Sequence, residues 1–231
     1  MKTLMSILQK RIKFLFISAF IWLIIPDLQA QFELNIFGES GLPYGTFRQN
    51  TQAVGLGFGS SLIYPLDKER RFSVGGDFNY EIYGKESKND ASESYRMITN
   101  NNIFMMHAII RFMPYHEGFI KPYFDLKGGF KNFYTKTKIK EQILFGESVE
   151  QISEFNDFAG SYGAGLGINF RYPERMGYFV EASFLAGGRA TYVDRKSFER
   201  TPDDELVFSS KTSDTNMLVF RFGLSFYPTA Q

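Results

Sequence analysis

Eight stretches of this chain alternate apolar and polar residues with a period of two, and in all eight the charged residues fall on one face only. In the stretch from 72 to 83, Phe72, Val74 and Phe78 share one face, while Asp77 and Glu81 share the other. Successive side chains of a β-strand point to opposite sides, so this alternation predicts strands with one apolar and one polar face. The apolar faces contain no Asp, Glu, Lys or Arg, although 22% of the chain is charged. The two faces must therefore meet different environments.

The connections between these stretches alternate in length. The expected strands cover residues 32–44, 53–64, 72–83, 103–113, 121–134, 157–171, 178–192 and 217–227. The second, fourth and sixth connections are short, whereas the third, fifth and seventh are long and polar, at 84–102, 135–156 and 193–216; the first, 45–52, is modest. Transmembrane barrels have short periplasmic turns and longer outer loops. The pattern predicts an all-β fold, an eight-stranded antiparallel transmembrane β-barrel of up-and-down topology with both termini in the periplasm.

Residues 1–30 are expected to form a cleaved signal peptide, which leaves 31–231 as the barrel domain. Lys2, Lys10 and Arg11 make a basic start, and an uncharged apolar run of residues 14–25 follows before Pro26. That run is short for a membrane-spanning helix, which needs about 20 residues. An uncleaved anchor is the alternative interpretation.

Composition excludes several classes of function. The chain has 26 basic and 25 acidic residues, and this near-neutral charge gives no support for nucleic-acid binding. It contains no cysteine, so neither a disulfide framework nor a thiolate metal site is available. No carboxylate set shows metal-ligand spacing, so neither a metal nor another cofactor is expected. After the first 30 residues no segment stays apolar for 18 residues, which excludes helical membrane spans.

Two kinds of eight-stranded barrel differ in the side to which the polar face of each strand points. A lipocalin-like barrel is apolar inside and polar outside, whereas a membrane barrel turns its apolar face to lipid. The apolar face here is continuous and bulky, so we expect it to face lipid and the charges to face the lumen. An interior of eight strands is filled by side chains, and unpaired charges there are costly. We therefore predict a lumenal salt-bridge network of Glu33, Glu39, Asp77, Glu81, Arg111, Asp125, Lys127, Lys131, Asp157, Arg171, Glu181, Arg189 and Arg221, with Lys121 beside them.

Two runs of alternating glycines fall on the inward face, Gly55, Gly57 and Gly59 in one strand and residues 163, 165 and 167 in another. Long side chains from neighbouring strands can cross over such bare backbone. A nucleotide-binding loop is the alternative, but that fingerprint requires a strand, a turn and a helix start. The glycines here lie inside strand patterns.

These features resemble the small outer-membrane β-barrels of the OmpA and OmpX type, a β-barrel domain group common in Bacteroidota. The resemblance covers nearly all of residues 31–231 and includes the last strand, in which Gly223, Leu224 and Phe226 match the group's C-terminal signal for the barrel-assembly machinery. Residues 228–231 follow that signal, where members of the group usually stop. The resemblance implies insertion into the outer membrane by that machinery. The anchoring role of two-domain relatives is not carried over to this chain. The resemblance indicates an architecture and does not indicate an activity.

Catalysis is the minority hypothesis. Some outer-membrane barrels modify lipid A with a His, a Ser and an acidic residue, but this chain has only two histidines. His107 is expected to be a hydrogen-bonded lumen residue beside Arg111, and His116 to lie solvated in a short turn. Neither has the His-x-Ser spacing of the deacylases, so we expect no enzyme and assign no catalytic residue.

Aromatic residues gather near the strand ends. Interface girdles are expected from Tyr64, Phe72, Tyr115, Tyr123, Tyr172, Tyr178 and Tyr227 at the short turns and from Tyr44, Tyr80, Tyr134, Tyr162 and Tyr192 near the long loops. Phe145, Phe198 and Phe208 in the loops are candidate contact residues.

The sequence therefore predicts a structural or interaction protein that works through its outer loops, with outer-membrane lipid as a partner and a protein of an outer-membrane complex as a candidate partner. An accessory subunit of an outer-membrane export or assembly complex is the alternative. A narrow pore ranks third, because the lumenal charges and the bulky inward residues Phe37, Tyr83 and Phe133 should block it.

Overall fold

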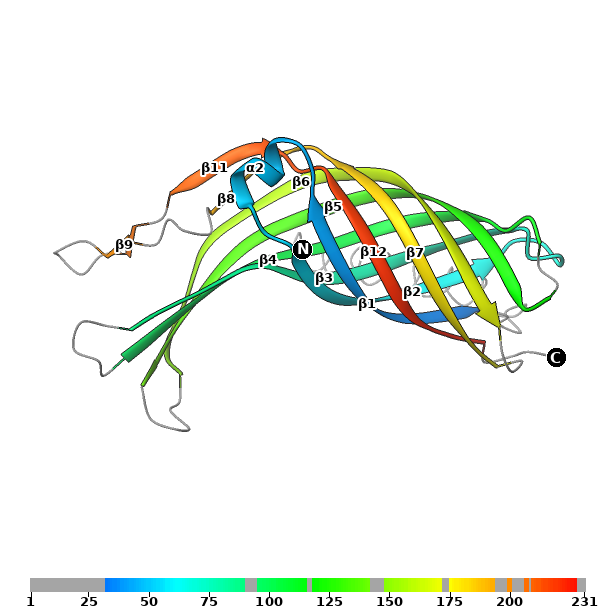
Figure 1. Cartoon of the computed structure of the whole chain (residues 1–231), viewed down its shortest axis with the longest axis horizontal. Helices are drawn as coiled ribbons and strands as arrows, with labels where there is room; N and C mark the ends of the chain where they lie inside the picture. Colours follow the sequence, from blue (N-terminus) through cyan, green and yellow to red (C-terminus); the bar gives the residue numbers. More distant parts are fainter. Residues whose placement is uncertain are drawn as a thin grey trace, which may run out of the picture.

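Eight antiparallel strands close into a barrel in the computed structural model, which describes residues 32–89, 95–115, 118–141, 148–171, 175–193, 199–200, 206–207 and 209–227 (Figure 1). The strands are β1 (Glu33–Pro43), β2 (Gly55–Pro65), β3 (Phe72–Asn89), β4 (Tyr95–Phe112), β5 (Ile120–Glu141), β6 (Ser148–Arg171), β7 (Met176–Gly187) and β12 (Met217–Phe226). Each pairs with the barrel strands before and after it in the chain, and β12 closes the barrel against β1, with Glu39 opposite Arg221. This confirms the predicted up-and-down barrel.

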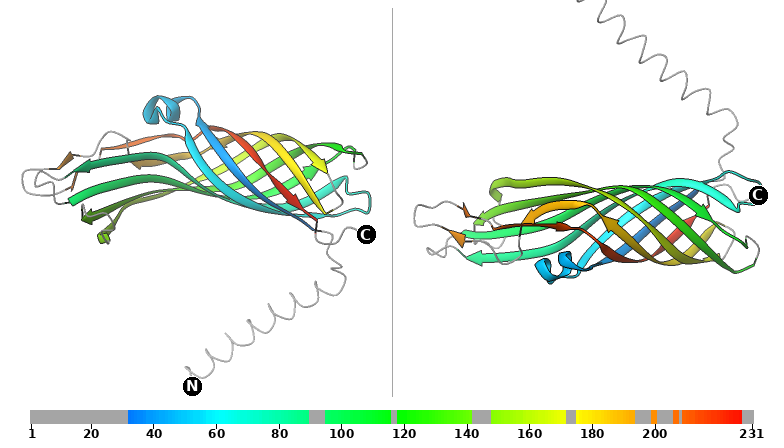
Figure 2. Two further views of the ribbon diagram at one scale, coloured as in Figure 1. Left: turned by 60° about the horizontal axis from the view of Figure 1, so that its bottom comes forward. Right: turned by 90° about the horizontal axis from the view of Figure 1, so that it is seen from above.

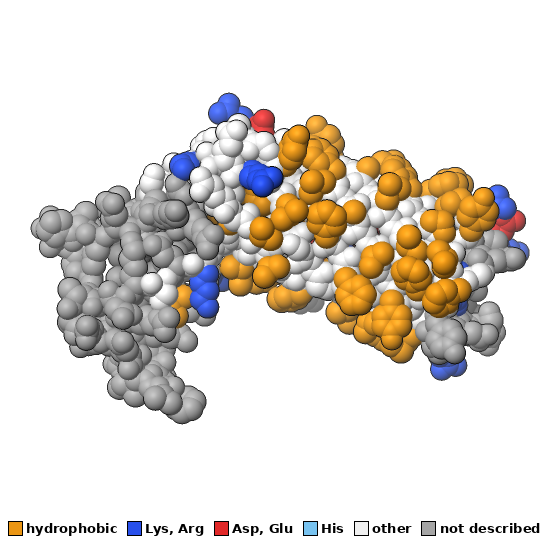
Figure 3. Space-filling model, viewed as in Figure 1, with side chains coloured by type: hydrophobic (Ala, Val, Ile, Leu, Met, Phe, Trp, Pro, Cys, Tyr) orange, Lys and Arg blue, Asp and Glu red, His pale blue; other side chains and the backbone are white. Residues whose placement is uncertain are grey.

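The wall separates apolar from charged side chains as the alternation predicts. Phe58, Leu166 and Phe222 each expose more than 60% of their surface on the outside, and Figure 3 shows many hydrophobic side chains spread over the face of the barrel turned to the viewer. Asp77 and Arg221 are buried inside. A lipocalin-like barrel would show the reverse, and so large an apolar surface requires lipid around it.

Both described ends of the chain lie at one end of the barrel, because Leu34 near the start of β1 pairs with Phe226 at the end of β12. The three short connections, which follow β2, β4 and β6, lie at the same end, called here the turn end (Figures 1 and 2). In the first of them the Asp67 carboxylate accepts hydrogen bonds from the backbone N–H groups of Arg71 and Phe72. The predicted signal peptide, residues 1–30, lies outside the described residues.

Four strands are longer than the sequence predicts. β3 and β4 stay paired as far as Asn89 and Arg96, and β5 and β6 as far as Lys140 and Ser148. The predicted loops 84–102 and 135–156 are therefore largely strand, and they carry a four-stranded sheet beyond the closed wall. We call this the hairpin end (Figure 1). The prediction was wrong here because outward positions outside the lipid are polar, which removes the apolar half of the pattern.

The seventh predicted strand also differs. β7 ends at Gly187, and a separate strand β8 (Arg189–Val193) pairs with β11 (Ser210–Asp214). A further short pair, β9 (Glu199–Arg200) and β10 (Leu206–Val207), completes the connection. After Gly188 the faces are exchanged, so that Arg189 is exposed and Tyr192 is buried, opposite to the prediction. A one-residue shift has this effect because the side-chain period is two.

The first connection contains a one-turn helix, α2 (Thr46–Thr51), where the sequence predicts only a loop. Gly45 precedes it with a φ of 63°, a backbone conformation that glycine adopts without steric cost. The helix buries Phe47 and Thr51. Within the described residues no helix has the length and apolar character needed to cross a bilayer.

Candidate functional site

Two linked clusters of charged side chains occupy the barrel interior. In the first, the Arg111 guanidinium donates to both carboxylate oxygens of Asp125, at 2.8 and 3.0 Å, and to Glu33 at 2.9 Å. Its Cζ atom also lies 3.8 Å from the centre of the Tyr123 ring. Bidentate pairing fixes the orientation of an arginine as well as its position.

The second cluster centres on Arg221 of β12. Its guanidinium donates to Asp77 at 2.8 Å, to Glu39 at 3.2 Å and to Glu181 at 3.5 Å. Lys127 Nζ lies 2.5 Å from Glu181 Oε1 and 3.6 Å from Asp77 Oδ2. The Asp77 carboxylate therefore meets two cations and the Glu181 carboxylate meets three, since Arg111 also lies within ion-pair distance of it. Arg221 is the one cation that contacts Glu39 among the described ion pairs.

Glu181 joins the two clusters. Its Oε2 atom accepts a hydrogen bond from the Tyr123 hydroxyl at 3.2 Å and lies 4.0 Å from Arg111 Nη2. Tyr123 reaches it across Gly167, where an added Cβ would clash with the Tyr123 ring. The inward glycines thus leave room for side chains that cross from one strand to another.

His107 lies between Asp77 and Ser161. The sequence predicted a hydrogen-bonded lumen residue, but beside Arg111. Its Nδ1 atom is 2.9 Å from Asp77 Oδ1, and its Nε2 atom is 3.0 Å from Ser161 Oγ. It crosses Gly129, which separates positions 107 and 161 in the ladder. His116 lies outside the described residues.

The connectivity of Asp77, His107 and Ser161 is that of a Ser-His-Asp triad. A triad needs a nucleophile that substrate can reach, yet the exposed fraction of Ser161 is 3% and that of His107 is 1%. Asp77 is in addition held by Arg221 and Lys127. The arrangement therefore satisfies buried polar groups and does not form an accessible reaction site.

Glu81 and Lys131 are fully buried near the hairpin end of the lumen, but they do not pair directly. Lys131 Nζ donates to the carbonyl oxygen of Thr215 at 2.7 Å and to that of Leu185 at 3.4 Å. The Glu81 carboxylate lies over Gly55 and accepts no hydrogen bond from the residues that the structure describes.

The remaining predicted network residues lie at the edges. Asp157 is half-buried, and its carboxylate accepts hydrogen bonds from the backbone N–H groups of Phe158 and Thr191. Arg171 is half-buried, with its guanidinium 4.5 Å from the centre of the Tyr227 ring. Lys121 is buried. Arg189 is exposed on β8, so its predicted place in the lumen was wrong.

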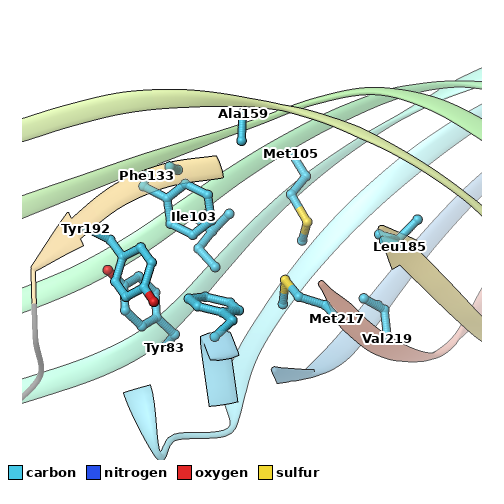
Figure 4. Packing of buried hydrophobic residues seen from close by; sticks show 11 residues of the cluster. Tyr83, Ile103, Met105, Phe133, Ala159, Leu185, Tyr192, Met217 and Val219 are labelled. Carbon is cyan, nitrogen blue, oxygen red and sulfur yellow. The ribbon is translucent and has the colours of Figure 1, made fainter. Parts of the chain in front are cut away.

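Above the charged clusters an apolar group fills the hairpin end of the lumen (Figure 4). Phe47 of α2 is fully buried, and its ring centre lies 5.0 Å from that of Tyr192, 5.7 Å from Phe133 and 6.2 Å from Tyr83. The Asn50 amide donates to the Tyr192 hydroxyl at 2.9 Å, which ties the helix to β8. We call the packing of Phe47 against Tyr83, Phe133 and Tyr192 the cap. The sequence analysis missed it, and the only signal for it is a single Phe in an otherwise polar connection.

Three aromatic residues assigned to the interface girdles are buried in the interior instead: Tyr123, Tyr192 and Tyr227. Others are exposed as predicted, at Tyr44, Tyr64, Phe72, Tyr115, Tyr162 and Tyr178. Tyr172 and the candidate loop contacts Phe145, Phe198 and Phe208 lie outside the described residues.

No group of three or more His, Cys, Asp or Glu side chains with metal-binding geometry occurs within the described ranges.

The sequence matches no family model and no curated protein. Solved structures with a similar chain path include Neisserial surface protein A, at 10% identity and a TM-score of 0.48, covering 86% of this chain and 97% of that one. Ail of Yersinia pestis, in complex with the heparin analogue sucrose octasulfate, has 12% identity and a TM-score of 0.42, covering 84% and 95%.

A major outer membrane protein from Thermus thermophilus has 9% identity and a TM-score of 0.41, covering 84% of this chain and 98% of that one. The architecture itself follows from the geometry described above: a closed eight-stranded wall, apolar outside and charged inside. This chain is therefore a small β-barrel of the outer-membrane type.

Proposed function

We propose that the protein is a closed, non-enzymatic outer-membrane barrel that acts as a structural or interaction protein through its hairpin end. The observation that carries this proposal is the sheet of β3 to β6, which stays paired well beyond the closed wall. A barrel that only had to fill the membrane would not need these extensions. Paired strands also hold their residues in fixed positions, which favours recognition over mobile shielding.

The proposed orientation places both chain ends and the short turns in the periplasm and the hairpin end outside. It is supported by the position of Leu34 beside Phe226 at the turn end and by the contrast in connection length. Insertion by the barrel-assembly machinery would follow from the terminal strand.

A closed lumen is the second part of the proposal. Ion pairs centred on Arg111 and Arg221 cross the interior, and the cap around Phe47 packs over one end. Moving a hydrated ion through would require breaking buried charge pairs, which is costly. We therefore expect no small-solute flux in liposomes, whereas steady flux would favour the narrow pore.

An accessory subunit of a larger outer-membrane complex is the second candidate. The observation in its favour is an apolar groove of about 550 Å³ in the outer wall, which includes Pro122, Leu166, Val180 and Phe220. A partner that binds this wall would be lost from a mild-detergent pull-down when Val180 is replaced by a larger Trp. It would be retained when the hairpins are shortened.

The orientation can be tested with single cysteines, because the chain has none of its own. Ser87→Cys lies in the hairpin extension and Lys68→Cys in the turn between β2 and β3, and both positions are exposed. A membrane-impermeant maleimide added to intact cells should label the first and not the second. The opposite labelling pattern would reverse the orientation.

The interaction role can be tested by trimming. Replacing residues 86–97 and 138–151 by short turns removes the extensions and keeps the closed wall, since strand pairing there does not depend on connection length. We expect the trimmed barrel to keep heat-modifiable migration and to lose partner capture or the cellular phenotype. A trimmed barrel with full activity would refute the role of the hairpin end.

A further inference from the structure

Side chains on either side of an inward glycine meet as donor and acceptor at two places in the lumen. Tyr123 and Glu181 flank Gly167 in the ladder, and the tyrosine hydroxyl donates to the carboxylate at 3.2 Å. His107 and Ser161 flank a second glycine in the same way, and their polar atoms lie 3.0 Å apart. A glycine on the middle strand therefore lets the side chains of its two neighbours reach each other.

Glu39 and Glu81 have the same arrangement, but both are carboxylates. The ladder pairs Gly57 of β2 with Glu39 of β1 on one side and with Glu81 of β3 on the other. Ionised carboxylates only accept hydrogen bonds, and these two repel each other electrostatically. Two acceptors thus meet across this glycine, whereas the other two glycines each join a donor to an acceptor.

The charge of Glu39 is compensated within the lumen. Its Oε2 atom accepts a hydrogen bond from Arg221 Nε at 3.2 Å. Its Oε1 atom accepts none from the residues that the structure describes, although it is buried. Glu39 is therefore an ion-paired carboxylate with one oxygen that can still accept a hydrogen bond.

The carboxyl group of Glu81 is buried without any donor. Its exposed fraction is 0%, and neither oxygen accepts a hydrogen bond from the described part of the chain. It lies on the bare backbone of Gly41 and Gly55, where an added Cβ at either position would clash with it. The methyl group of Met217 lies against the same backbone. An ionised carboxylate in this position would lack both water and a hydrogen-bond donor, which is strongly unfavourable.

The cations that face Glu81 do not neutralise it. Arg221 of β12 attracts it, but the Nε and Nη1 groups of this arginine donate to Glu39 and to other carboxylates. Lys131 of β5 attracts it as well, yet its ammonium group donates to the backbone carbonyl oxygen of Thr215. Neither cation forms an ion pair with Glu81 among the described residues.

The cap separates this carboxyl group from the hairpin end of the lumen. Tyr83 follows Glu81 by two residues on the same inward face of β3, and its ring centre lies 6.2 Å from that of Phe47. Ile103, opposite Glu81 in the ladder, is fully buried in the same apolar group. Bulk water therefore cannot solvate an ionised form of Glu81 from that side.

We propose that Glu81 is a proton-binding site of the folded barrel, which takes up one proton from the surrounding water as the strands close while Glu39 stays ionised. A neutral carboxyl group ends the repulsion across Gly57, and its O–H group is a donor for the Glu39 Oε1 atom. No third carboxylate or histidine joins these two within the described ranges, which favours a proton over a metal ion. Proton binding in the lumen is independent of the role proposed for the hairpin end.

The main test compares the unmodified barrel with Glu81→Gln, whose amide has the shape of a neutral carboxyl group. Both are unfolded with urea in lipid vesicles between about pH 5 and pH 8. Above about pH 5 the unfolded chain leaves Glu81 ionised, whereas the folded barrel holds its proton, so stability falls as the pH rises. The unfolding equilibrium constant of the unmodified barrel should therefore rise about tenfold more per pH unit than that of Glu81→Gln. Lys131 is present in both barrels, so its own titration cancels in the comparison.

Infrared spectroscopy detects the proton directly. At neutral pH the unmodified barrel should show the C=O stretch of a protonated carboxyl group, and Glu81→Gln should lack this band. The matched control is Glu69→Gln, because Glu69 is an exposed carboxylate that pairs with Arg71 in a turn. It should keep both the infrared band and the pH dependence of the unmodified barrel.

Equal pH dependence in the unmodified barrel and in Glu81→Gln, or the absence of the infrared band, would overturn the proposal. A Glu81→Gln barrel that does not fold would also overturn it, because an amide should replace a neutral carboxyl group. Sodium chloride that stabilises only the unmodified barrel, relative to choline chloride at equal ionic strength, would identify the bound charge as a metal ion instead. All these measurements use the isolated barrel, so they are separate from the surface-labelling and trimming experiments.

Discussion

Replacing Arg221 by Leu should destabilise the barrel strongly, because three buried carboxylates share this guanidinium. Asp77 and Glu181 would keep Lys127, but Glu39 would lose the one cation that contacts it in the described ion pairs. Leaving one partner of a buried ion pair without its counter-charge costs about 3 to 5 kcal/mol. We therefore expect Arg221→Leu to lower the free energy of unfolding by that amount.

The assay is reversible urea unfolding in lipid vesicles, followed by circular dichroism. Adding Glu39→Gln to the Arg221→Leu variant removes the stranded charge, so the double variant should recover stability, with a coupling energy of about 1 kcal/mol or more. Arg71→Leu is the control, because its pair with Glu69 is exposed and should be worth about 1 kcal/mol or less. An Arg221→Leu barrel within about 0.5 kcal/mol of the unmodified protein would refute the network as a source of stability.

Three further changes test separate parts of the account. Phe220→Arg puts a charge on the lipid-facing wall and should cost about 2 to 4 kcal/mol near the bilayer midplane; unchanged vesicle unfolding would mean that the faces are inverted. Phe47→Ala should cost about 3 to 5 kcal/mol of cap packing without opening a conducting path, since the ion pairs remain; solute flux would contradict this. Hydrogen bonds from the backbone N–H groups of Phe72 and Arg71 hold the pKa of Asp67 below its usual 3.8. As the pH falls, these bonds should therefore persist through pH 3.8 and be lost only at a lower pH, and amide shifts of Phe72 that titrate at or above pH 3.8 would refute this.

The barrel could be predicted from the sequence because residues that face lipid are apolar, whereas the alternate residues that face the lumen include the charged ones. Phe220 and Arg221 are adjacent in the chain, yet one faces lipid and the other forms three ion pairs. That contrast exists only while a strand crosses the bilayer. From Thr135 to Lys138 every residue of β5 is polar, so the alternation that identifies a strand vanishes although the ladder continues to Lys140.

The site could be predicted in composition but not in connectivity. Period-two alternation places Asp77, Glu181 and Arg221 inside, whereas their pairing depends on the stagger between strands that are distant in sequence. The partners of His107 illustrate this, because Gly129 has to lie between it and Ser161 before the two can meet.

Two local events also escaped the periodicity. A six-residue helix is too short for a window that needs about 11 residues to reveal a helical period. The exchange of faces after Gly188 depends on a Gly-Gly step that can end a strand but does not state which register follows. Arg189 and Tyr192 were therefore misplaced, and the burial of Phe47 was missed, for reasons of local backbone geometry.

The most direct test of the central claim is a tryptophan scan of β12 in vesicles of brominated lipid. The only Trp of the chain, Trp22, lies in the predicted signal peptide, so a Trp introduced at each position from 217 to 226 reports on that position alone after removal of residues 1–30. We predict strong quenching at the outward positions Leu218, Phe220, Phe222 and Leu224 and weak quenching at the inward positions between them. Quenching that follows the inward positions, or that shows no period of two, would contradict a membrane barrel with a charged interior.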